Sequence, residues 1–337
     1  MEILPNILAS HSFKIFIELN SSLKEVNMKY FSWGIWVALI SMSCTSQSID
    51  QVPPTKLFEN KIELEGKPLL LASDSLYAPL YLAAVDSFLI VHGRFPKNNE
   101  TYLFKILNRN TGKILNSFGR VGRGPDEFFY PSFLSRVPDE SRTIGIYNPR
   151  LFSFIELSID SILTQAGQLT ITSYKEFDVS YSKLIKMNQS LFVGTGYFSD
   201  GRYALTDTSR QFFRVSGNYP FEEMLTATKQ ALDMAFQSQL RRHPDQPLLV
   251  SATTSSANLE ILKLKDHKLD VIAQVNSYPP VFENTSLNNS ISISYNPESR
   301  WGYQDITVTE KYIYALYSGK EKAEDRFYFG DQVLVFN

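Results

Sequence analysis

The run Gly119-Arg120-Val121-Gly122-Arg123-Gly124 is the first candidate for binding chemistry in this sequence. A phosphate-binding loop ends in Gly-Lys-Ser or Gly-Lys-Thr and leads into a helix, whereas Pro125 and aromatic residues follow here. The glycine spacing is also the reverse of the dinucleotide-binding pattern. We therefore interpret the run as a structural connector. Arg120 and Arg123 remain candidates for contacting an anionic ligand.

The histidines give little support for a metal or a cofactor. His11, His92, His243 and His267 are widely separated, and no H-E-x-x-H pair occurs. We expect no metal site and no cofactor. His92 is kept with Arg120 and Arg123 as a candidate ligand contact.

Hydrolytic chemistry also lacks a local motif. No G-x-S-x-G nucleophile elbow is present. The carboxylate pairs Asp126-Glu127 and Glu222-Glu223 are sequence neighbours, and neighbouring residues on a helix point about 100° apart. Catalytic acids would have to come together from separate strands, which the sequence alone does not exclude.

Composition defines the class of protein more firmly. The 337 residues are 43% hydrophobic and 13% aromatic, which is enough for a packed core in one or two domains. A net charge of -2 argues against nucleic-acid binding through a broad basic field. Cys44 is the single cysteine, so no intrachain disulfide can form.

The segment before Cys44 has the layout of a secretory signal. Residues 28–43 combine a charged start with a short apolar stretch, too short to span a membrane. Cys44 then resembles the lipidated cysteine of a bacterial lipobox, although Ser41 and Met42 depart from the usual residues. The alternative is a short buried segment with an ordinary thiol. The lipobox interpretation makes Met28 the start, 1–27 a non-structural extension, and 44–56 a tether.

From residue 57 to residue 337 the sequence predicts short strands separated by turns. Asn110-Thr111-Gly112-Lys113 is a hairpin turn between strands at 102–107 and 114–118. Such units recur about every 40 to 60 residues, which is near the period of propeller blades. Five units, the fifth of which includes a strand at 290–295, together with leading strands at 62–64 and 69–72 that complete the last blade, predict an all-β, six-bladed β-propeller. The chain stops inside an apparent strand, so we expect a truncated C-terminus or an imperfectly closed ring.

One segment breaks the pattern of strands. Residues 221–242 contain apolar residues at roughly helical spacing with no internal Gly or Pro, and His243-Pro244 follows. We predict a single inserted helix, which either packs against one face or forms a lid or a partner-binding insertion.

The chain also resembles a known family. The connector at 119–128, with Pro131 behind it, resembles the blade connector of NHL-type propellers. The region from about residue 57 to the end is similar to the TolB-like six-bladed propeller lipoproteins of Bacteroides, on the evidence of that connector, the strand at 312–319 and Cys44. The resemblance implies a propeller on an envelope lipoprotein, at the periplasmic or surface side of the outer membrane. It implies no established activity and no catalytic residues.

These observations favour a binding or scaffold module for a protein or glycan partner, attached to the membrane only by its lipid. The alternative is an enzyme, a lyase or glycoside hydrolase, with its site in the central funnel. An enzyme should bring titratable side chains together in the funnel. A binding module should instead expose an apolar patch.

Overall fold

The computed structural model describes the following residues: 53–65, 79–93, 102–122, 124, 127–129, 133–138, 140, 142–164, 169, 171–287, 290–323 and 330–337. All of them belong to the second of two units, which begins at Asp50. Cys44, Arg123, the predicted extension 1–27 and the predicted signal 28–43 lie outside the described residues. None of the described helices is both long enough and apolar enough to cross a membrane.

The first sheet contains the predicted hairpin. Its strands are β1 (Pro79–Val85), β2 (Phe88–Gly93), β3 (Tyr102–Asn108), β4 (Ile114–Val121) and the short β5 (Glu127–Phe128). Strands β3 and β4 pair antiparallel around the turn, in which Gly112 has a φ of 70°. The Asn108 carboxamide oxygen accepts hydrogen bonds from the N–H groups of Asn110 and Thr111, both at 3.0 Å. This local bonding explains why the turn could be predicted from the sequence.

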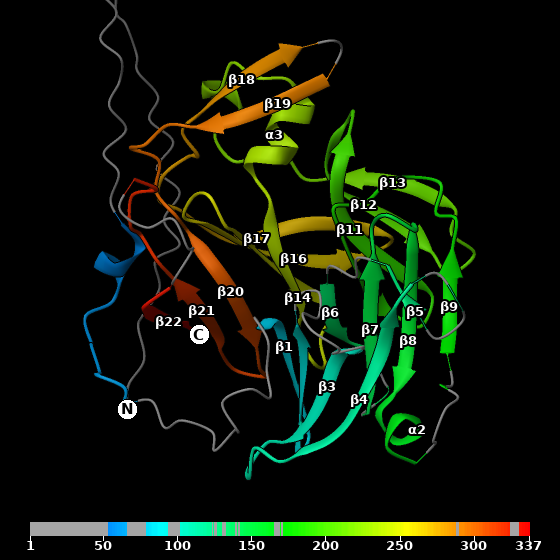
Figure 1. Ribbon diagram of the computed structural model, residues 1–337. Coiled ribbons are helices and arrows are strands. Elements are labelled where there is room, and N and C mark those ends of the chain that lie inside the picture. Colours follow the sequence, from blue (N-terminus) through cyan, green and yellow to red (C-terminus); the bar gives the residue numbers. More distant parts are fainter. Residues whose placement is uncertain are drawn as a thin grey trace, which may run out of the picture. The chain divides into compact units, whose positions relative to one another are not determined.

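The next three sheets are four-stranded antiparallel meanders (Figure 1). The second consists of β6 (Phe133–Arg136), β7 (Thr143–Asn148), β8 (Ser153–Ser158) and β9 (Ile171–Lys175), with the short helix α2 (Ile159–Thr164) after β8. The third consists of β10 (Lys183–Asn188), β11 (Leu191–Phe198), β12 (Gly201–Asp207) and β13 (Phe212–Ser216). The fourth consists of β14 (Ser238–Arg242), β15 (Leu248–Thr253), β16 (Asn258–Lys265) and β17 (Lys268–Asn276).

The last two sheets differ from the predicted fifth unit. Strands β20 (Tyr303–Val308), β21 (Ile313–Tyr317) and β22 (Gln332–Phe336) form a three-stranded sheet, while β18 (Phe282–Leu287) and β19 (Ser290–Tyr295) form a separate hairpin. Assigning the 290–295 strand to the fifth unit was therefore wrong. Pro279 and Pro280 precede β18 and have no N–H for a ladder, and the apolar side chain of Ile293 packs on the inserted segment instead.

The N-terminal segment reaches the last sheet without forming a strand. The 3-10 helix η1 (Pro54–Leu57) is followed by residues 58–65, which carry no strand, so the predicted strand at 62–64 was wrong. Ile62 is 83% exposed, so it has no core to pack into. Phe58 nevertheless makes an edge-to-face contact with Phe336 of β22, with 5.1 Å between ring centroids. The predicted strand at 69–72 lies outside the described residues.

The predicted single helix over 221–242 is corrected by the structure. The segment contains the 3-10 helix η2 (Glu222–Met224), the helix α3 (Lys229–Ala235) and the strand β14. The Thr228 side chain caps α3 by accepting a hydrogen bond from the N–H of Ala231. Strand β14 is the first strand of the fourth sheet and pairs with β15. Backbone pairing with β15 outweighed the helical spacing of the apolar residues.

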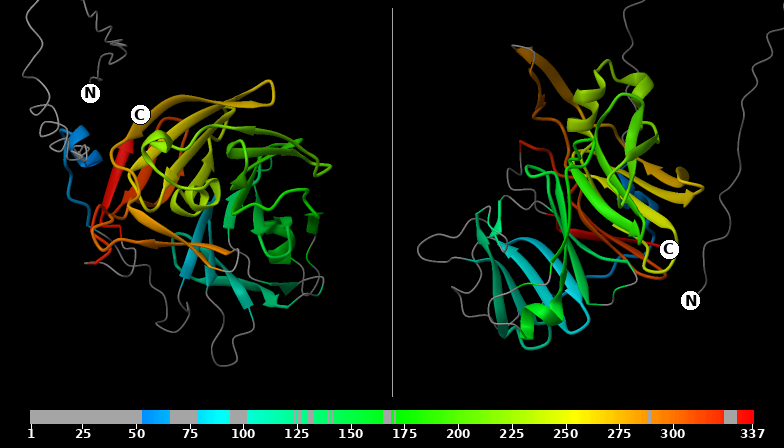
Figure 2. Two further views of the ribbon diagram at one scale, coloured as in Figure 1. Left: turned by 90° about the horizontal axis from the view of Figure 1, so that it is seen from above. Right: turned by 90° about the vertical axis from the view of Figure 1, so that its right-hand side faces the viewer.

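Neighbouring sheets pack through aromatic and aliphatic side chains (Figure 2). The first strands of successive sheets also contact one another: β1 with β6, β6 with β10, β10 with β14 and β14 with β20.

The connector after β4 depends on Gly119, whose φ is 72°. A Cβ at Gly119 would lie 2.7 Å from the Phe104 ring and 2.9 Å from the Phe128 ring. Glycine therefore lets Phe128 close this corner of the core.

Candidate functional site

Of the three predicted ligand contacts, His92 and Arg120 are among the described residues, and they lie on different strands. His92 on β2 is 4% exposed and stacks on Tyr81 and Phe104, with ring centroids 5.7 and 4.8 Å away. Burial lowers the pKa of His92 to about 4, so the imidazole is neutral at pH 7. His92 is thus a packing residue of the first sheet. No three His, Cys, Asp or Glu side chains of the described residues are grouped as they would be to hold a metal ion.

Arg120 lies on β4, at the far side of the first sheet from β1. Its side chain is exposed, and its guanidinium lies 5.7 Å from the centroid of the Tyr102 ring. Strand β3 separates β4 from the strand of His92. The structure therefore does not bring Arg120 and His92 together.

Polar side chains that were not predicted as site residues lie on the first strands of the third, fourth and last sheets. We call Lys183, Gln239, Arg241, Gln304 and Asp305 the inner-strand cluster. Lys183 Nζ donates to Gln239 Oε1 at 2.8 Å, and Gln239 Nε2 donates to the Gln304 carbonyl at 2.9 Å. Arg241 Nη2 lies 2.9 Å from Asp305 Oδ1. These contacts join the third, fourth and last sheets in sequence.

The electrostatics of the inner-strand cluster argue against glycoside hydrolysis there. Burial, with a contribution from Arg241, lowers the pKa of Lys183 to about 7. The single carboxylate of the cluster, on Asp305, is held by Arg241. Glycosidases use two carboxyl groups on opposite sides of the scissile bond, and this cluster does not supply them. Its contacts tie blades together.

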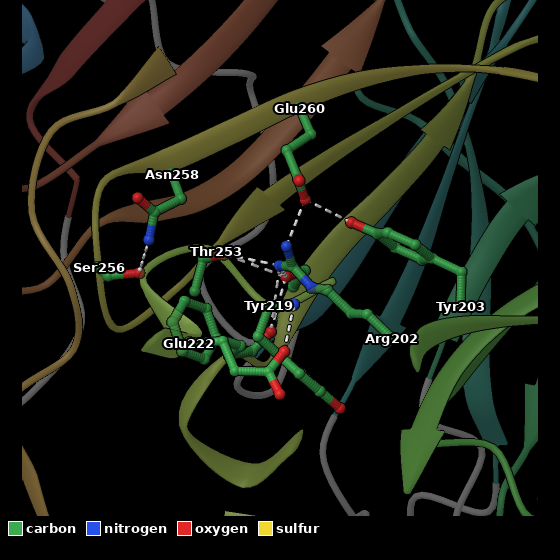
Figure 3. A network of polar contacts seen from close by, with 10 residues as sticks. Arg202, Tyr203, Tyr219, Glu222, Thr253, Ser256, Asn258 and Glu260 are labelled. Atoms are coloured by element: carbon green, nitrogen blue, oxygen red, sulfur yellow. Dashed lines mark hydrogen bonds and ion pairs between the residues drawn. The ribbon is translucent and has the colours of Figure 1, made fainter. Parts of the chain in front are cut away.

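A second polar network is fully buried between the third and fourth sheets (Figure 3). Arg202 on β12 is 1% exposed and forms an ion pair with Glu260 on β16, which is 3% exposed. The Tyr203 hydroxyl donates to the same Glu260 oxygen at 2.7 Å. Arg202 Nη2 donates to Ser238 Oγ at 2.7 Å and to Thr253 Oγ1 at 2.9 Å. A buried charge with these partners is compensated on both sides.

The Arg202 network also supports the inserted segments. Arg202 Nη2 donates to the Phe236 carbonyl at 3.5 Å, at the C-terminal end of α3. We call η2, α3 and the β18–β19 hairpin, with the loops that join them, the cap. A small apolar cluster holds the cap together: Tyr219, Leu232, Ala235 and Phe236 are buried, with Leu225, Ala227, Phe282 and Ile293 packed against them.

The cap contains an open groove of about 490 Å³. It is lined by Leu225, Thr226, Ala227, Pro279, Pro280, Val281, Phe282, Glu283 and Asn284. Most of these side chains are apolar, and Glu283 is the one charged residue among them. Val281 is 37% exposed, and Met224 beside the groove is 52% exposed. The volume of the groove falls within the range of ligand-binding sites, and the groove is open and exposes polar as well as apolar atoms.

Asp233 on α3 should make the free energy of unfolding depend on pH. Burial raises the pKa of Asp233 to about 6, although Ser182 Oγ donates to it at 3.3 Å. A carboxyl whose pKa is raised by folding contributes stability below its unfolded pKa of about 4, and this contribution is lost as the pH rises through about 6.

We therefore expect Asp233→Asn to raise the free energy of unfolding at pH 7 by about 1–2 kcal/mol, and to have little effect at pH 4. Urea unfolding of both proteins at the two pH values measures this difference. Asp86→Asn, at an exposed side chain, is the control. Equal stability of parent and Asp233→Asn at pH 7 would contradict the raised pKa.

The fold and the comparisons together place the chain in a family. Its antiparallel meanders are blades of a β-propeller, and the predicted all-β propeller class is confirmed. The sequence model of the TolB-like 6-blade propeller-like family matches residues 59–337, so the chain belongs to that family. In the described part of the chain, five sheets have the meander of a blade, and β18–β19 is an additional hairpin.

Solved structures similar to this chain are distant. A protein of Bacteroides fragilis NCTC 9343 is 13% identical, with a TM-score of 0.44 over 82% of this chain and 74% of that one. A duf4221 family member from Bacteroides vulgatus is 11% identical, with a TM-score of 0.43 over 78% of each chain. No curated protein matches the sequence.

Proposed function

We propose that this protein is a binding module of the bacterial envelope that holds a protein partner in the groove of the cap. The observation that carries the proposal is the open, mostly apolar groove between residues 225–227 and the start of β18. Exposed apolar surface with a defined shape is typical of interaction sites. The rigid propeller beneath would position the cap.

A protein partner fits the groove better than a glycan partner does. Phe282 is the single aromatic residue in the lining, and it is only partly exposed because it packs against the cap cluster. The two prolines and the aliphatic groups would be poor partners for sugar hydroxyls, but Leu225, Pro280 and Val281 suit apolar side chains of a protein.

The groove is tested by placing a charge in it. We expect Val281→Lys to reduce partner capture at least about tenfold, because an unpaired ammonium group buried in the interface opposes binding by more than about 1.4 kcal/mol. Capture is measured by photo-crosslinking from residue 226 in cells that naturally make the protein, followed by quantitative mass spectrometry. Ile272→Lys is the matched control, since Ile272 is 54% exposed on β17 and does not line the groove. Equal losses in the two variants would argue against the groove.

Attachment to the membrane is proposed through Cys44. The apolar segment before this cysteine, followed by the polar tether 44–56, supports lipid attachment to the thiol. In a bacterial host fed a labelled fatty acid, we expect label on the parent chain and none on Cys44→Ala. Absence of label from both proteins would argue against a lipid anchor and leave the groove proposal unaffected.

A further inference from the structure

We propose that the groove takes an extended peptide segment, which pairs with β18 as a third strand and places a basic side chain near Glu283. This inference rests on the proposed function and specifies the chemical class of the partner. It requires a strand edge that can be reached from the groove, side walls that accept a peptide, and charge of one sign at the groove.

The strand edge comes from the hairpin itself. In the described part of the chain, β18 pairs only with β19, so its other edge has no strand partner there. In Figure 1 β18 is the outer strand of the hairpin, and α3 packs against β19. The groove is lined by Phe282, Glu283 and Asn284 in succession. Because successive side chains point to opposite faces of a strand, a groove that touches three in a row follows the edge of β18.

The opposite wall is a turn that follows η2. Residues 225–227 form it, and the Ala227 N–H donates to the Leu225 carbonyl at 2.9 Å, so this wall offers side chains and not a strand edge. Leu225 and Ala227 pack against the cap cluster, which fixes this wall relative to β18. A peptide in the groove would exchange main-chain hydrogen bonds with the edge of β18 and place alternate side chains against the 225–227 wall, which is the mode of strand addition.

The charge on the groove selects the peptide. Glu283 lines the groove and is exposed, and Glu223 lies two residues before Leu225, also exposed. No Lys or Arg is among the lining residues, and the nearby Lys229 is paired with Glu222. Electrostatic complementarity therefore favours a peptide with apolar residues and a Lys or Arg over an acidic one.

The cap is already organised for such a peptide. Strands β18 and β19 pair continuously from Phe282 with Tyr295 to Leu287 with Ser290. The Tyr295 hydroxyl donates to the Met234 carbonyl on α3 at 3.3 Å, which ties the hairpin to the helix. A fixed edge reduces the entropy lost when a partner strand pairs with it.

The probe for the experiment is a random ten-residue peptide library displayed on phage and selected against the full chain. Peptides whose binding is lost in Val281→Lys and kept in Ile272→Lys are synthesised, and each backbone N–H is methylated in turn. We expect methylation to weaken binding about tenfold at every second position and little at the positions between, since only alternate N–H groups face the neighbouring strand. Selected sequences should be enriched in Lys or Arg.

The charge is tested with Glu283→Gln, which should weaken binding of a Lys-containing peptide about two- to fivefold. Glu310→Gln, at an exposed residue that does not line the groove, should have no effect. Methylation effects without a two-residue period would overturn strand addition, and equal effects of the two Glu variants would overturn the selection of a basic side chain; either result leaves groove binding intact. Selection of no groove-dependent peptide, with photo-crosslinking still sensitive to Val281→Lys, would also overturn strand addition. Loss of both signals would overturn the proposed function itself.

Discussion

Replacing Arg202 with methionine is expected to lower the free energy of unfolding by about 3–5 kcal/mol. Arg202 and Glu260 are both almost fully buried, and methionine leaves the Glu260 carboxylate with the Tyr203 hydroxyl as its remaining hydrogen-bond donor in the network. An uncompensated carboxylate in the protein interior is costly because it has lost its water. Urea unfolding followed by circular dichroism measures the change.

Two further variants separate loss of the buried charge from loss of packing. Arg202→Met combined with Glu260→Leu removes both charges, and we expect it to recover most of the lost stability. Arg210→Met is the surface control, since Arg210 Nη1 lies 4.0 Å from Glu176 Oε2 and both side chains are exposed, and it should cost less than about 1 kcal/mol. A cost for Arg202→Met as small as that of Arg210→Met would contradict a structural role for the buried pair.

The same variant should loosen the cap before the propeller. Arg202 Nη2 holds the Phe236 carbonyl and Ser238 Oγ, at the point where α3 leads into β14. Hydrogen exchange should therefore accelerate in α3 more than in β16 when Arg202 is replaced. Uniform acceleration across the two elements would show that the network supports the blades and not the cap.

The parts of this fold that could be predicted are those determined by local sequence. The hairpin at 108–113 closes on its own Asn108 side chain and on Gly112, so residues close in sequence suffice to define it. In the first four sheets, consecutive strands are joined by such short turns. The glycine-rich joint at Gly119 marks the point where the chain leaves the first sheet. Period-two alternation and turn residues carry this information without reference to the rest of the chain.

The errors fall where tertiary contacts decided between local alternatives. Residues 238–242 have apolar spacing compatible with a helix, but β15 offers a complete backbone partner and the segment pairs with it as β14. Residues 290–295 alternate like a blade strand, yet they pack on α3 after the break at Pro279 and Pro280. Neither choice can be made from a window of one sequence.

The candidate site was missed for a related reason. Its two walls, at 225–227 and 279–284, are far apart in the sequence, and neither has a catalytic or ligand motif. Two residues that were predicted as ligand contacts lie elsewhere in the structure. His92 is part of an aromatic stack with Phe104, and the Arg120 guanidinium lies over the Tyr102 ring. Pro279-Pro280 followed by Val281-Phe282 was a signal available in the sequence, because two prolines interrupt a strand ladder directly before an apolar pair.

Gly302 marks a point where two blades meet through their backbones, and Gly302→Ala is expected to cost about 3 kcal/mol or more. A Cβ at this position would lie 1.7 Å from the Ser256 carbonyl oxygen and 2.6 Å from that of Thr253. The Gly302 N–H donates to the Thr254 carbonyl at 2.8 Å, and its own carbonyl accepts from the N–H of Ser318 at 3.1 Å. The backbone is held on both sides, so it cannot move away from a methyl group without breaking one of these bonds.

Gly124→Ala is the matched control for Gly302→Ala. Its Cβ would lie 3.1 Å from Glu127 Oε2, which accepts a hydrogen bond from the Gly124 N–H at 2.8 Å. The flexible Glu127 side chain can shift slightly and keep this bond, so we expect a cost below about 1 kcal/mol. Urea unfolding of the two variants measures the difference. Comparable costs would mean that the 253–256 loop yields easily at Gly302. A much larger cost at Gly302 would mean that close backbone packing between Gly302 and residues 253–256 holds the fourth and last blades together.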